Sequence, residues 1–188
     1  MSTSTLYRLS ALAALLSGFC ITVGKLLIVL PNPLAGEVFD FFAPLFGLSA
    51  ILGIYLWQRE RSGRFGGVAF IVVFTGLALI VSLDYAGAFI LPHLTEDTVT
   101  ELLDSPAGLV YGLSAIIFLV GEILFGISVI RAGVFSKIAA WLFMIGFVPM
   151  TLLGVFPVII VAVGSVMAGV GIIWWGLSLW SLARNGAD

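Results

Sequence analysis

The chain contains very little of the chemistry on which metalloproteins, disulfide-bonded proteins and most soluble enzymes depend. In 188 residues it has one cysteine, Cys20, one histidine, His93, and only 10% charged residues. A single cysteine excludes a disulfide framework within the chain, and a single histidine excludes a haem held by two histidines of one chain. The sequence motifs of phosphate-binding loops, zinc proteases and serine hydrolases are also absent. The sequence therefore predicts no catalytic, cofactor-binding or metal-binding residue, and it leaves any cofactor unknown.

Apolar residues, by contrast, dominate the chain. Hydrophobic residues make up 61% of the sequence, and the mean hydropathy is +1.23. A soluble domain of this length would need far more polar surface. The apolar residues form continuous runs, which is typical of membrane-spanning α-helices and not of alternating barrel strands. We predict an all-α, polytopic membrane helix bundle, a single integral membrane domain over the whole chain, with six transmembrane spans at about 9–30, 38–57, 67–91, 107–130, 137–155 and 157–182.

The charges are distributed unevenly between the connections of these spans. The connections that would lie on one side contain acids and no lysine or arginine. By the positive-inside rule, the basic connections and both termini face the cytoplasm, so we expect a multi-pass protein of the plasma (inner) membrane. The net charge of −2 gives no reason to expect a nucleic-acid partner. The basic residues of the cytoplasmic side are Arg8, Arg59, Arg61, Arg64, Arg131, Lys137 and Arg184.

The connection between the third and fourth spans is long enough to contain a helix of its own. Thr95 followed by two acids is a typical helix start, and apolar residues then recur at helical spacing. Ser105 and Pro106 should begin the next span as its cap and first residue. We expect an amphipathic helix on the outer surface, either as a lid over a cavity or as a connector resting on lipid.

Three ionisable residues lie within the predicted spans and form a candidate intramembrane polar site: Lys25, Asp84 and Glu122. Each costs at least ~2.5 kcal/mol to insert, so each needs a partner, a cavity or neutralisation. Lys25 lies roughly 8 Å, and Asp84 about 10 Å, from the outer ends of their spans. The matching depths predict a Lys25–Asp84 ion pair, which could be a binding site or a structural pair. Asp40 is expected at the level of the outer headgroups.

Glu122 lies deeper than the other two residues. It is roughly 22 Å from the outer end of its span and about 13 Å from the inner end. A short carboxyl side chain cannot reach water from that depth, and burial favours its neutral form. Two hypotheses stay open: a proton relay or cation site, or a neutral acid that is hydrogen-bonded to a neighbouring helix.

Small residues recur every three to four positions in the last span, at Gly164, Ala168 and Gly171. This spacing is typical of close helix–helix contacts, either inside the bundle or with a second copy or a membrane-complex partner. The sequence also repeats itself, since residues 46–51 (FGLSAI) match residues 111–116 (YGLSAI). The repeat raises the possibility of a duplicated two-helix hairpin.

A segment of the C-terminal half resembles a known group. Residues 123–133 read ILFGISVIRAG, and Ala139-Ala140-Trp141-Leu142 and Gly146 follow. This pattern is similar to small bacterial six-helix inner-membrane proteins known only as domains of unknown function, in which a glycine-bearing helix ends in arginine before a Trp-Leu-Gly helix. The resemblance implies a prokaryotic inner-membrane protein, and it transfers no catalytic or binding residue.

The function that these observations favour is a non-enzymatic one. We expect a ligand-binding or transporter-like bundle, or an accessory subunit, with the three intramembrane residues in its interior. One alternative is a structural subunit of a larger membrane complex, and another is an intramembrane enzyme that uses Glu122 as acid and base. The residues available for such an enzyme, mainly serines and threonines such as Ser17, Thr75 and Ser165, include no clear nucleophile–base pair.

Overall fold

The computed structural model describes residues 3–30, 33–152 and 155–185, and this part of the chain is almost wholly helical, with no strand. Four of its helices are long and apolar enough to cross a membrane. These are α1, α2, α4 and α6; α5 is apolar but shorter, and η1 and α3 connect α2 to α4. The elements are α1 (Thr3–Val29), α2 (Pro33–Phe89), η1 (Leu91–His93), α3 (Glu96–Asp104), α4 (Pro106–Ala132), α5 (Lys137–Thr151) and α6 (Val158–Asn185).

Helix α2 contains the second predicted span and all but the last two residues of the third. The sequence predicts a loop at residues 58–66, but the structure is helical on both sides of a single non-helical residue, Gly63. The chain reverses there, and the two arms, residues 33–62 and 64–89, run back along each other. Tyr55 stacks on Phe70 with ring centroids 4.4 Å apart. Each arm exceeds the roughly 20 residues that a span requires.

The backbone conformation of Gly63 should be strained, and the protein less stable, when any other residue takes this position. Gly63 has φ 58° and ψ −153°, a region that is essentially open only to glycine. Gly133 after α4 has φ 64° and ψ 22°, the left-handed region that asparagine also adopts. We expect Gly63→Asn to cost about 1–3 kcal/mol of stability, whereas Gly133→Asn should cost well under 1 kcal/mol. Thermal unfolding in detergent compares the two; equal losses would contradict a tight reversal at Gly63.

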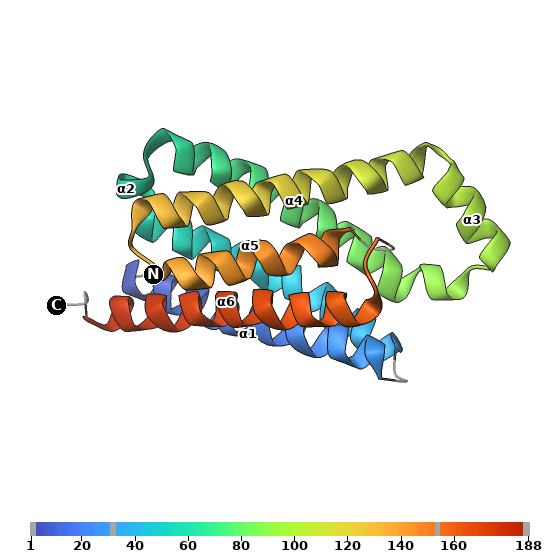
Figure 1. The fold of residues 1–188 in the computed structure, drawn as a ribbon, viewed down its shortest axis with the longest axis horizontal. Helices are drawn as coiled ribbons and strands as arrows, with labels where there is room; N and C mark the ends of the chain where they lie inside the picture. Colours follow the sequence, from blue (N-terminus) through green and yellow to red (C-terminus); the bar gives the residue numbers. More distant parts are fainter. Residues whose placement is uncertain (1–2, 31–32, 153–154, 186–188) are drawn as a thin grey trace.

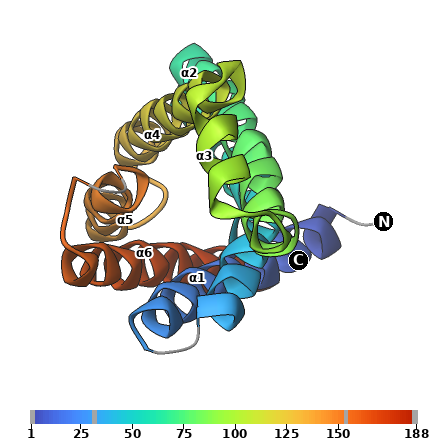
Figure 2. The same ribbon diagram turned by 90° about the vertical axis from the view of Figure 1, so that its right-hand side faces the viewer.

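The helices close into a ring. Helix α1 packs against α2 and α6, α6 against α5, α5 against α4, and α4 against α2. Figure 2 shows this ring from the end at which α3 lies. The second arm of α2 contacts α4 closely, because a Cβ atom on Gly121 would lie 2.6 Å from the Cα atom of Val73. Each helix therefore presents one face to a shared interior.

Charge is segregated between the two ends of the ring. In Figure 1 the start of α1, the reversal of α2, the α4–α5 connection and the end of α6 lie at one end, and α3 lies at the other. These elements place the seven basic residues other than Lys25 at or near the first end, which we call the basic end. The opposite end, the α3 end, carries the acids of α3. This arrangement is the alternation that the sequence predicts, while the side of the membrane stays a prediction.

The short helix between the long ones is confirmed. Thr95 caps α3, and its Oγ1 accepts a hydrogen bond from the backbone N–H of Thr98 at 3.4 Å. Ser105 caps α4, and its Oγ accepts one from the N–H of Ala107 at 3.1 Å, with Pro106 as the first helical residue. Leu102 and Leu103 are exposed on α3, as expected of an amphipathic surface helix.

Helix α5 is shorter than the predicted span over 137–155. It has 15 residues and ends at Thr151, so it extends only about 22 Å along its axis. The hydrocarbon core of a bilayer is about 30 Å thick. Residues 153–154 lie outside the described part of the chain.

Candidate functional site

A cavity of about 390 Å³ lies inside the ring. Residues of α1, both arms of α2, α4, α5 and α6 line it, and most of them are apolar. A volume of this size suits a drug-sized molecule, and such sites typically combine apolar walls with a few placed polar groups. The polar side chains of the lining are those of Ser17, Lys25, Asp40, Asp84, Tyr111, Glu122 and Thr151. All three residues of the predicted polar site therefore line one cavity.

The ion pair of Lys25 differs from the predicted one. The ammonium group of Lys25 pairs with the carboxylate of Asp40, not with that of Asp84. The Lys25 side chain is 19% exposed and that of Asp40 is 7% exposed. Asp40 was expected at headgroup level because the second span was predicted to begin at residue 38. The helix begins at Pro33 instead, which places Asp40 about 10 Å along it.

A glycine brings the two partners of this pair together. Gly24 precedes Lys25, and a Cβ atom there would lie 3.1 Å from the backbone nitrogen of Asp40. Helices α1 and α2 can approach this closely because Gly24 has no side chain. Ser17 adds a second link between α1 and α2, since its hydroxyl donates a hydrogen bond to the carbonyl oxygen of Ala43 at 2.8 Å. Two features of the sequence could have indicated the Lys25–Asp40 pair: the glycine that precedes Lys25, and a helix start at Pro33.

Asp84 lies near this pair without joining it. It lines the cavity from the second arm of α2 and is half-buried. Its charge acts on Lys25, as does that of Glu37. Within the described ranges, no hydrogen bond or ion pair of Asp84 is formed. The α3 end of the cavity thus holds one ammonium group and two carboxyl groups, those of Asp40 and Asp84, and Glu37 lies nearby outside the lining.

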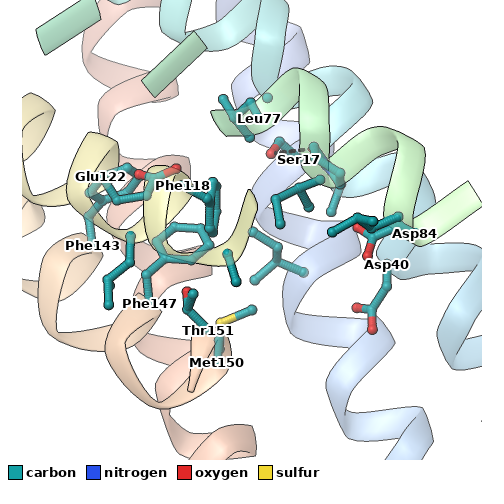
Figure 3. A pocket seen from close by; sticks show the side chains of 18 of the residues that line it. Ser17, Asp40, Leu77, Asp84, Phe118, Glu122, Phe143, Phe147, Met150 and Thr151 are labelled. Atoms are coloured by element: carbon teal, nitrogen blue, oxygen red, sulfur yellow. Dashed lines mark hydrogen bonds between the residues drawn. The ribbon is translucent and has the colours of Figure 1, made fainter. Parts of the chain in front are cut away.

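Glu122 lies at the other side of the cavity, among aromatic rings. Its side chain is 1% exposed, and its Oε2 atom has no hydrogen-bond partner in the described part of the chain. In Figure 3 Glu122 is close to Phe118 and Phe143, across the cavity from Asp40 and Asp84. Among the described residues, no group of a neighbouring helix forms the hydrogen bond that the hypothesis of a neutral, bonded acid requires. An unsatisfied buried polar group costs roughly 1–3 kcal/mol.

The aromatic wall around Glu122 is built by three helices. Phe118 of α4 meets Phe147 of α5 edge to face, with centroids 5.2 Å apart. Phe143 of α5 lies 4.7 Å from Trp175 of α6 by the same measure. All four rings line the cavity. Trp175 is fully buried, whereas its neighbour Trp174 is 42% exposed and does not line the cavity.

The repeated sequence lies on the cavity wall in both copies. Gly47, Ala50 and Ile51 line it from the first arm of α2, and their counterparts Gly112, Ala115 and Ile116 line it from α4. Both segments run from the α3 end towards the basic end. Ile51 is buried whereas Ile116 is 60% exposed, so the two copies differ in burial and the duplication stays a prediction.

The small residues of α6 form contacts inside the chain. A Cβ atom on Gly164 would lie 2.6 Å from the carbonyl oxygen of Gly146 in α5, and one on Gly171 would lie 2.7 Å from that of Ala139. Ala168 is fully buried in the same contact. These three residues are therefore occupied by α5, and association of α6 with another copy or a complex partner stays a prediction.

Comparisons with known proteins place no constraint on the function. No family model, no curated protein and no solved structure matches the chain. The resemblance of residues 123–146 to small bacterial six-helix inner-membrane proteins stays a prediction. Among the described residues, no three histidine, cysteine, aspartate or glutamate side chains are grouped as a metal site would require. The function is therefore inferred from the cavity and the residues that line it.

Proposed function

We propose that the chain is a multi-pass protein of a bacterial inner membrane that binds a small amphiphilic molecule in its central cavity. In this proposal the chain crosses the membrane six times, α5 being a short segment, and both termini lie in the cytoplasm. The observation that carries it is one cavity of about 390 Å³ with ionisable groups at both sides and apolar walls from every long helix. Ionisable residues are costly in a membrane and are characteristic of ligand and ion sites.

Binding or transport fits this arrangement better than catalysis does. Serine and threonine hydroxyls of the lining, such as that of Ser17, which bonds a backbone carbonyl, are not arranged as nucleophile and base with Glu122. A catalytic site normally pairs such groups within hydrogen-bond reach. A binding site needs only shape, apolar surface and a few polar contacts, all of which the cavity supplies.

Filling the cavity is expected to abolish binding without unfolding the bundle. Ala115 lines the cavity from α4, so Ala115→Trp would place a large ring inside the space that a ligand needs. Leu113 lies two residues away, is 57% exposed and does not line the cavity, which makes Leu113→Trp the matched control. We expect native mass spectrometry of protein purified in mild detergent to show a small molecule bound to wild type and to Leu113→Trp. Ala115→Trp should lose it at least tenfold.

The same measurement separates the competing functions. Stoichiometric partner proteins and no small molecule in the wild-type sample would support a structural subunit instead. A small molecule retained equally by Ala115→Trp would place binding outside the cavity and contradict the proposal. Conversion of the bound molecule during incubation, lost in Glu122→Gln, would support an intramembrane enzyme.

A further inference from the structure

The carboxyl group of Glu122 has no positive partner among the residues that the structure describes. Within the described ranges, Lys25 is the only cation of the cavity lining, and it pairs with Asp40 at the α3 end. Glu122 is on the opposite side of the cavity in Figure 3. It is almost fully buried, and one of its oxygens is unpartnered in the described ranges. A ligand that enters the cavity therefore meets a carboxyl group that no side chain satisfies.

The surroundings of Glu122 select the kind of group that could satisfy it. Phe118, Phe143, Phe147 and Trp175 line the same cavity, and aromatic faces attract cations by about 0.5–2 kcal/mol each, most when water is excluded. A carboxylate with aromatic rings around it suits an organic cation, because the charge is neutralised and the apolar substituents contact the rings. An anionic ligand would meet the same negative ring faces and no cation on this side of the cavity among the described residues, so it would be disfavoured.

The other side of the cavity also favours cations. The carboxyl groups of Asp40 and Asp84 in the lining outnumber the single ammonium group of Lys25, and Glu37 adds a third acid nearby. Tyr111 and Ile116 line the cavity and yet are 41% and 60% exposed, so the cavity opens beside the first turns of α4. Acids at an opening raise the local concentration of cations. An opening between apolar helices also admits molecules that partition into lipid.

We propose that the ligand is a lipophilic organic cation whose charged group binds the carboxylate of Glu122 within the aromatic wall. This inference rests on the proposed function, because it names the class of molecule that the cavity takes. In the empty cavity, burial favours the protonated acid. The cation replaces this proton, which leaves through the cavity to water, so one positive charge is exchanged for another. The bound carboxylate is then neutralised without a bare charge in an apolar surrounding.

The exchange has a definite pH dependence. Lower pH holds the proton on Glu122 and opposes the cation, so affinity rises with pH, by up to tenfold per unit while the empty site is protonated. The other titratable groups of the lining are Lys25 on α1, Asp40 and Asp84 on α2, and Tyr111 on α4. Helices α5 and α6 contribute none to the lining within the described residues. Asp40 and Asp84 are also titratable carboxyls of this lining, so the part of the pH effect that belongs to Glu122 is the part that Glu122→Gln removes and Asp84→Asn leaves in place.

Calorimetric titration with tetraphenylphosphonium tests this assignment, because the probe keeps its charge at every pH. Wild type in mild detergent is expected to bind tetraphenylphosphonium at least tenfold more tightly at pH 8 than at pH 6. At pH 8 it should bind the neutral triphenylphosphine oxide at least tenfold more weakly than tetraphenylphosphonium. Glu122→Gln should lose the affinity and most of the pH dependence, whereas Asp84→Asn should keep both. Glu122→Asp, which keeps the charge, should retain the pH dependence. Glu101→Gln removes an exposed acid of α3 and should bind as wild type does.

Each other result overturns the assignment in a recognisable way. Equal binding of the charged and neutral probes, without pH dependence, would leave a ligand cavity but no cation site at Glu122. Loss of binding in Asp84→Asn but not in Glu122→Gln would place the cation at the α3 end. No binding of either probe to folded wild type would refute the cation class, while the Ala115→Trp comparison decides separately whether the cavity binds a molecule. Thermal unfolding of each variant confirms that it is folded.

Discussion

Gly146→Ala is expected to lower the stability of the bundle by about 2–3 kcal/mol, the upper part of the range for overpacked interiors. An added Cβ atom would lie 2.5 Å from both the carbonyl oxygen of Gly164 and the backbone nitrogen of Ala168. Both atoms belong to the backbone of α6, so neither can move aside as a flexible side chain would. The helices α5 and α6 would have to separate, and the rings of Phe143 and Trp175 would lose their contact.

The matched control for this substitution is Gly112→Ala. A Cβ atom on Gly112 would meet nothing within 4 Å, and this glycine is also helical. Alanine is favoured over glycine in a helix by roughly 0.5–1 kcal/mol, so the control should leave stability unchanged or raise it. Thermal unfolding and denaturant titration in the same detergent measure both variants. A Gly146→Ala protein as stable as Gly112→Ala would show that α5 and α6 are not in backbone contact.

Asp40→Asn is expected to destabilise the protein by about 3 kcal/mol, the lower end of the range for breaking a buried ion pair. Lys25 would keep its charge between α1 and α2 with only Asp84 and Glu37 nearby. The lower end applies because the Lys25 side chain is 19% exposed and faces a cavity. Lys25→Met combined with Asp40→Asn should recover at least half of the loss, because no unpaired charge then remains.

Two double-mutant cycles separate the observed pair from the predicted one. Coupling between Lys25 and Asp40 should exceed about 1 kcal/mol, whereas coupling between Lys25 and Asp84 should stay below about 0.5 kcal/mol. Reversible unfolding of the single and double variants in one detergent gives both values. The reverse order would show that Lys25 pairs with Asp84, as the depths of the two residues alone suggest.

The local features of the fold follow from the sequence because they depend on neighbouring residues. The cap of α3 at Thr95 and the start of α4 at Ser105 and Pro106 are predicted from residue types that satisfy free backbone groups at helix ends. The reversal of α2 is less predictable. A polar, basic segment between apolar runs indicates a loop, yet one glycine suffices to turn the chain, and Arg59 and Arg64 are helical.

The candidate site shows where sequence reasoning stops. Lys25, Asp84 and Glu122 are recognised because ionisable residues stand out in apolar runs, and all three line the cavity. The depth of Asp40 depends on where its helix begins, which a hydropathy pattern locates only to within a few residues. The aromatic wall around Glu122 is invisible in the sequence, because Phe118, Phe147 and Trp175 are ordinary apolar residues until three helices bring them together.

The sequence by itself determined the helical class, the helix caps and the separation of basic from acidic ends, since these depend on composition, spacing and chain order. Only the tertiary structure decided that Lys25 pairs with Asp40, that Gly164 contacts α5 and that Glu122 faces a cavity without a partner. Such contacts depend on which helices are neighbours, how each is rotated about its axis and how closely glycines let them approach. Those quantities are set by the packing of all the helices at once.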